Sequence, residues 1–161
     1  MAILNIIYGI FQLSILIKPY RDFLFPNINS ESEIKQFLMD NEEQMQKFVG
    51  ILSKLPYNEI EIYNWVISDE STIFADGNDV FIDDIIEDRQ FLCDFILDNK
   101  ITYVEKNNSI IYIVTDVAKD YEQGIAWNKT NDSAELPSTD NLNIYYSKKI
   151  YDEYYFFKGR D

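Results

Sequence analysis

The stretch ITYVEKNNSIIYIVTDV (Ile101–Val117) decides the fold of this chain. Two runs of β-branched and aromatic residues flank Asn107 and Asn108, and asparagine tolerates the positive φ that a tight hairpin turn requires. Helical patterns dominate before this stretch, and strand patterns follow it. We therefore expect a single α+β domain over residues 1–161, with N-terminal helices packed on a C-terminal antiparallel sheet of about four to six strands.

The second run of this hairpin is apolar on both faces. Ile110, Tyr112 and Val114 form one row suited to the core, whereas Ile111 and Ile113 point to the opposite face. The second row needs cover as well. It must lie under a helix, inside a closed sheet or against another chain, and the last option would be a homodimer formed through the sheet.

A helix start precedes the hairpin at Ser30. Ser30 and Glu33 have the spacing of a capping box, and apolar residues then recur at helical spacing from Ile34 to Leu52. The pattern ends before Pro56, so we expect one helix over this whole segment.

The next segments alternate between strand and helix patterns. Asn58–Asp69 has period two, which predicts a strand with Tyr63 and Trp65 on one side, and Asp76-Gly77-Asn78 predicts a turn. A helix is expected over about Asp79–Asp98. Its outer side carries carboxylates at near-helical spacing, namely Asp83, Glu87, Asp94 and Asp98.

The C-terminal third predicts further strands. Gly124–Lys129 suits a short strand and Thr130–Asn141 a polar loop. The last hairpin is expected to pair Leu142–Ser147 with Ile150–Lys158 through a turn at Lys148-Lys149.

The N-terminal run Ala2–Ile17 is apolar, but no Lys or Arg precedes Lys18 and no small-residue cleavage site follows. The run is short and polar for a bilayer span. We interpret it as a buried helix, with an uncleaved membrane anchor as the alternative. The single cysteine, Cys93, lies among apolar residues and predicts a buried thiol. These features favour the cytoplasm.

The composition narrows the classes of function. The chain has 28 acidic and 14 basic residues, a formal net charge of −14 and no histidine. Its charge opposes direct binding of nucleic acid, and the missing histidine removes the commonest general base and metal ligand. Phe74 stands where an EF-hand around Gly77 would need an oxygen ligand, and no phosphate-binding glycine motif occurs. We expect no enzyme activity, no cofactor and no metal.

The charge favours a protein-binding module that attracts a basic partner. The concrete form is an immunity-type inhibitor that neutralises a nuclease toxin or another nucleic-acid-binding protein. The alternatives are a cone-like α+β domain that binds a small ligand or acts as a subunit, a phage or viral nucleic-acid mimic, and an enzyme that uses carboxylates and tyrosines alone. The candidate partner-binding residues are Asp83, Glu87, Asp94, Asp98, Tyr63 and Trp65.

Overall fold

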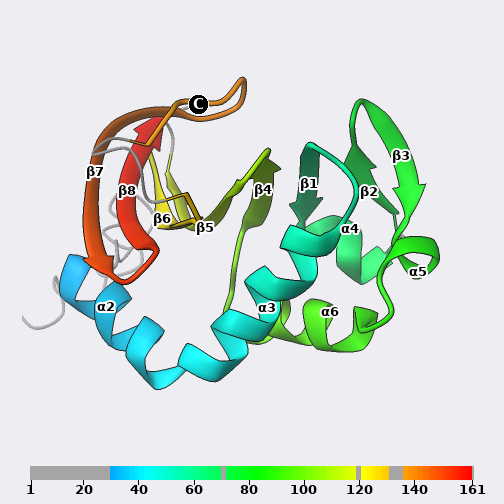
Figure 1. The fold of residues 1–161 in the computed structure, drawn as a ribbon, viewed down its shortest axis with the longest axis horizontal. Coiled ribbons are helices and arrows are strands. Elements are labelled where there is room, and N and C mark those ends of the chain that lie inside the picture. Colours follow the sequence, from blue (N-terminus) through cyan, green and yellow to red (C-terminus); the bar gives the residue numbers. More distant parts are fainter. Residues whose placement is uncertain (1–29, 70–71, 119–120, 131–135, 161) are drawn as a thin grey trace, which may run out of the picture.

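The computed structural model describes residues 30–69, 72–118, 121–130 and 136–160, which form an α+β arrangement (Figure 1). The elements in chain order are α2 (Glu31–Asp40), α3 (Glu42–Lys54), β1 (Glu59–Tyr63), α4 (Asn64–Asp69), β2 (Thr72–Ala75), β3 (Asn78–Phe81), α5 (Ile82–Ile85), α6 (Arg89–Asp98), β4 (Tyr103–Asn107), β5 (Ile110–Ala118), β6 (Tyr121–Asn128), β7 (Asn143–Tyr151) and β8 (Tyr154–Arg160). The fold class is as predicted, but the strand count is higher.

One sheet of eight strands organises the described chain, in the order β3-β2-β1-β4-β5-β6-β8-β7. Every neighbouring pair in it is antiparallel. The expected hairpin of β4 and β5 lies at its centre, and Asn108 has a φ of 53° at the turn. Strand β1 pairs with β4 across the intervening α4, β2, β3, α5 and α6, and this long-range pairing extends the sheet beyond the predicted size.

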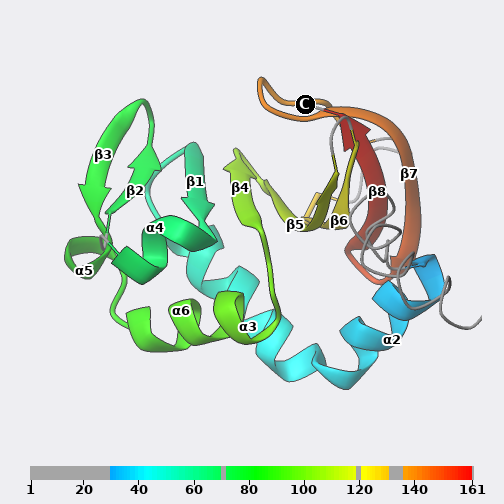
Figure 2. The ribbon, with the colours of Figure 1, turned by 180° about the vertical axis from the view of Figure 1, so that it is seen from behind.

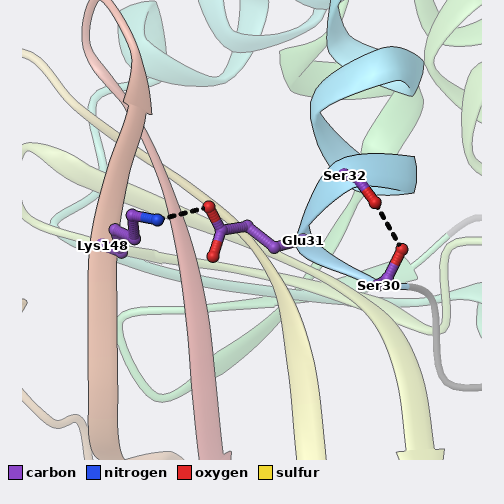
Figure 3. A network of polar contacts seen from close by, with 4 residues as sticks. All are labelled: Ser30, Glu31, Ser32 and Lys148. Carbon is purple, nitrogen blue, oxygen red and sulfur yellow. Dashed lines mark hydrogen bonds and ion pairs between the residues drawn. The ribbon is translucent and has the colours of Figure 1, made fainter.

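The capping box is present at the start of α2. The Ser30 hydroxyl accepts from the backbone N–H of Glu33, whose carboxylate accepts from the Ser30 N–H. The expected single helix is divided at Asn41, which ends α2 and begins α3. Glu31 at the first turn of α2 forms an ion pair of 2.7 Å with Lys148 of β7, so the helix start is attached to the far edge of the sheet (Figure 3).

The helices α2, α3 and α6 lie along one side of the sheet, as both ribbon views show (Figures 1 and 2). Their apolar residues and those of the strands form one continuous core. Phe48 of α3 and Phe95 of α6 form an aromatic contact within it, with ring centroids 4.7 Å apart. Ile111 and Ile113 of β5 belong to this core, so the second apolar row of the hairpin lies under helices.

The opposite face of the central strands has its own smaller core. Tyr112 and Val114 of β5 pack there with Phe157 of β8, and the connection between β6 and β7 supplies Leu136 and Leu142. The Tyr112 hydroxyl donates to the Pro137 carbonyl at 2.7 Å, which anchors this connection to the sheet. Both apolar rows are therefore covered within the chain.

Lys106 of β4 is an exception on the helix side, since a buried lysine is costly unless it is paired. Its ammonium donates to the Leu55 carbonyl just after α3, at 2.7 Å, and its side chain is 6% exposed. Burial lowers the pKa of Lys106 and Asp76 opposes that effect. A cation at a helix C-terminus also suits the helix dipole.

Several predicted elements are wrong in their boundaries, including the strand predicted over Gly124–Lys129, which is β6. The strand expected to reach Asp69 ends at Tyr63 and gives way to α4, and the helix expected from Asp79 is instead β3, α5 and α6. The predicted turn at Lys148-Lys149 lies inside β7, and the chain turns after Tyr151, where Asp152 has a φ of 41°. Lysines are suited to an edge strand, because charge there discourages pairing with another sheet.

The run Ala2–Ile17, expected to be a buried helix, lies outside the described residues. Among the residues that the structure describes, no helix combines the length and the apolar character needed to cross a membrane. Cys93 is buried as expected, and burial raises the pKa of its thiol.

Candidate functional site

The two aromatic candidates come together at the end of β1. Tyr63 is the last residue of that strand and Trp65 lies in the first turn of α4, with ring centroids 5.8 Å apart. Trp65 is 65% exposed, which is unusual for so large an apolar side chain. Tyr63 and Trp65 line the same pocket, although one belongs to the strand and the other to the helix that follows it.

These rings border a pocket of about 330 Å³ on the open face of β1–β3, by which we mean the face away from α3 and α6. The lining residues are Glu61, Tyr63, Trp65, Thr72, Ile73, Phe74 and Asp79. Strand alternation explains the two members from β1: Ile60 and Ile62 point to the helices, so Glu61 and Tyr63 point to the open face.

Cross-strand register places two carboxylates around one ring. Glu61 of β1 is opposite Phe74 of β2, and Phe74 is opposite Asp79 of β3. Phe74 is 43% exposed, and Phe81, opposite Thr72, is 63% exposed on the same face. Large exposed apolar side chains gathered on one face are typical of an interaction surface. We call Glu61, Tyr63, Trp65, Phe74 and Asp79 the aromatic–acidic pocket.

A group of acids and tyrosines, partly buried and partly shared with this pocket, continues toward the centre of the sheet. Glu105 of β4 is directly opposite Glu61, and Tyr103 of β4 is opposite Tyr63. The Tyr103 hydroxyl donates to Glu122 at 2.7 Å, and the Tyr63 hydroxyl donates to Glu61 at 3.0 Å. We call Glu61, Glu105, Glu122, Tyr63 and Tyr103 the acid–tyrosine cluster.

Glu105 has the most perturbed carboxyl group of the cluster. Its side chain is 5% exposed, and its Oε2 has no hydrogen-bond partner among the residues that the structure describes. Burial raises the pKa of Glu105 to about 7; a hydrogen bond from Thr139 opposes the shift, and repulsion from Glu61, Glu122 and Glu59 adds to it. An acid with a strongly raised pKa is a candidate for proton transfer. Glu105 is so deeply buried, however, that a substrate atom could hardly reach its carboxyl group.

The tyrosines of the cluster are kept protonated by the same environment. Burial, then Glu61, raises the pKa of Tyr63 to about 12, and burial with Glu122 holds the pKa of Tyr103 well above its usual range. Both hydroxyls therefore remain donors to carboxylates over the physiological pH range. Asn141 of the β6–β7 connection also donates to Glu61, at 2.7 Å.

The four acidic candidates do not share a helical face. Asp83 lies in α5, Glu87 in the following turn, and Asp94 and Asp98 in α6. All four are exposed, but the break between the two helices separates them from a common stripe. Asp83 pairs with Arg89 at 3.2 Å, and Asp94 accepts from Gln90 at 2.7 Å. The predicted acidic helix face is thus corrected, because Ile82–Ile85 closes as a separate short turn.

Sequence reasoning missed Glu61, Phe74 and Asp79 as site residues. Glu61 was visible as the polar member of an alternating pattern. The four-residue strands β2 and β3 were hidden by an assumed helix from Asp79, although the turn at Gly77, with a φ of 79°, was a signal for a hairpin.

Within the described ranges, no group of three or more His, Cys, Asp or Glu side chains is arranged to hold a metal ion. The chain matches no protein-family model, and comparisons with curated proteins and with solved structures give no significant match.

Proposed function

We propose that the protein is an acidic binding module that captures a basic protein partner on the open face of β1–β3. An immunity-type inhibitor of a nuclease toxin is the concrete form of this function. The observation that carries the proposal is the aromatic–acidic pocket, in which the exposed Trp65 and Phe74 lie beside Glu61 and Asp79. Aromatic anchors supply contact area, and carboxylates supply orientation and selectivity for a cation.

The net charge supports the same partner class. A formal charge of −14 accelerates encounter with a cationic surface and opposes binding of anionic ones. Four exposed acids contribute to this long-range field, namely Asp83, Glu87, Asp94 and Asp98. We predict that they also contact the partner, but that they contribute less than the aromatic–acidic pocket. The same charge opposes the alternative of a homodimer through this face, because two copies repel each other.

The test is capture of a partner from host lysate with tagged protein. The double variant Trp65→Ala/Phe74→Ala removes the pocket walls, and Met39→Ala/Leu97→Ala is the control, since these two exposed apolar residues lie on helices. A basic protein should be retained by the unaltered chain and the control but not by the pocket variant. Affinity for the purified partner should fall steeply with salt. Retention by the pocket variant, an acidic partner, or indifference to salt would each refute the proposal.

A small-ligand domain is the second candidate, favoured by the volume of the pocket, about 330 Å³, which lies at the lower end of ligand-sized cavities. A thermal-shift screen against neutral and anionic metabolites tests it, since a ligand that binds only the folded state raises the melting temperature. A hit that is abolished by Trp65→Ala, without any protein captured, would favour this candidate over the first.

A further inference from the structure

We infer that the aromatic–acidic pocket receives an arginine side chain of the partner. This inference rests on the proposed function, because it names the group that a basic partner inserts. It begins with the walls: Tyr63 and Trp65 are tilted by 34° at a centroid distance of 5.8 Å, and Phe74 completes the apolar lining. The electron-rich faces of such rings attract cations, and guanidinium groups most often.

The carboxylates of Glu61 and Asp79 are positioned for a ligand that carries hydrogen-bond donors on more than one edge. Glu61 and Asp79 are the cross-strand neighbours of Phe74 on its two sides. Adjacent strands are about 4.8 Å apart, so the two acids stand roughly 10 Å apart with the ring between them. A planar guanidinium over Phe74 can donate toward both sides, whereas the compact ammonium of lysine pairs as a single point.

The pocket also lacks compensation for its charge among the described residues. Among the described residues, the ion pairs Lys47–Asp88, Arg89–Asp83 and Lys148–Glu31 all lie outside the pocket, and none involves Glu61 or Asp79. Glu61 accepts one hydrogen bond on each oxygen, from Tyr63 and Asn141, and each oxygen has capacity for a second. Glu105, opposite Glu61, adds negative potential whenever it is ionised.

The chain already uses this type of contact elsewhere. Arg160 lies over the ring of Tyr145 with its guanidinium carbon 5.2 Å from the centroid, and Lys47 lies 4.0 Å from the centroid of Phe91. In the pocket the corresponding rings come with two acids and an open entrance, because Trp65 and Phe74 are both exposed. The pocket therefore offers aromatic rings and carboxylates to which an arginine side chain of a partner can bind.

The experiment uses the full chain and three capped tripeptides, acetyl-Gly-Xaa-Gly-amide, in which Xaa is arginine, lysine or citrulline. Citrulline is the neutral counterpart of arginine, with nearly the same shape. Binding is followed by NMR shifts of the Trp65 indole and of backbone amides. The arginine peptide should bind most tightly, the lysine peptide about two- to fivefold more weakly, and the citrulline peptide without measurable shifts.

Variants locate the site. Asp79→Asn and Trp65→Ala should each weaken arginine binding by about two- to fivefold or more. Asp40→Asn, at an exposed acid on α2 outside every proposed contact, should leave it unchanged. Equal binding of lysine and arginine, binding of citrulline, no binding of arginine, or shifts that map outside β1–β3 would overturn the inference.

The two proposals fail differently. Capture of a basic partner that needs Trp65, together with silent arginine titrations, refutes the arginine inference and leaves the proposed function standing. Arginine binding without any captured protein does the reverse and identifies the pocket as a site for small guanidinium compounds.

Discussion

Replacing Glu105 with glutamine should make the stability of the protein much less dependent on pH. In the folded chain burial raises the pKa of Glu105 to about 7, from an ordinary value of 4.5. Between these two pH values the folded protein keeps a proton that the unfolded chain releases. Unfolding then becomes easier as pH rises, and the loss is complete above the folded-state pKa.

The magnitude follows from the shift. At about 1.4 kcal/mol per pKa unit, ionising Glu105 in the folded protein costs about 3 kcal/mol in full, and about 2.5 kcal/mol of this falls between pH 5 and pH 8. Glutamine cannot ionise. The free energy of unfolding of Glu105→Gln, relative to that of the unaltered protein, should therefore rise by about 2.5 kcal/mol from pH 5 to pH 8. Repulsion from Glu61, Glu122 and Glu59 adds to the pKa shift of Glu105, so the variants are compared with the unaltered protein at the same pH.

The assay is urea unfolding followed by circular dichroism at several pH values from 5 to 8 and constant ionic strength. Glu43→Gln, an exposed glutamate on α3, removes the same charge and is the matched control. It should run parallel to the unaltered protein. If Glu105→Gln also runs parallel to it, within about 0.5 kcal/mol, the group is not buried as a neutral acid and the reasoning fails. A carboxyl NMR titration of Glu105 gives the midpoint directly.

Two further substitutions test the packing of the fold. Phe48→Ala removes a fully buried ring that contacts Phe95, and it should lower the free energy of unfolding in urea by about 3–5 kcal/mol. The control Met39→Ala, at an exposed residue, should change it by no more than about 0.5 kcal/mol. Equal effects of the two substitutions would contradict the assigned core. Gly124→Ala would place a β-carbon against the Ile113 carbonyl oxygen and should destabilise the protein by about 3 kcal/mol or more. Gly50→Ala in α3 has open space for the added methyl group and should stabilise the protein by about 0.5–1 kcal/mol. A tolerated Gly124→Ala would refute the close approach of β5 and β6.

The two faces of the sheet serve different purposes in this interpretation. The helices cover one face along its length, and the β6–β7 connection covers the opposite face over the central strands, with Leu136 and Leu142. On β1–β3 that opposite face keeps exposed aromatics, including Trp65, Phe74 and Phe81. Acidic side chains beside them discourage association between copies and favour a cationic partner.

Several features were predictable because short-range physics determines them. The capping box at Ser30 and Glu33 needs only residues three apart, and the hairpin turn at Asn108 needs only a residue that tolerates a positive φ. The two apolar rows of Ile110–Val114 also follow from strand alternation alone. Local patterns could not tell what would cover them, because that depends on distant segments.

The candidate site shows the same division. Tyr63 and Trp65 were identified from their residue types, and the sequence alone determined an acidic α+β domain with aromatic side chains beside β1. Only the tertiary structure decided that Glu61, Phe74 and Asp79 lie in one cross-strand row, and that Asp83, Glu87, Asp94 and Asp98 do not share a face. The physical reason is register: long-range pairing of β1 with β2 and β4 selects the neighbours of each side chain, and helical spacing within one segment carries no information about that choice.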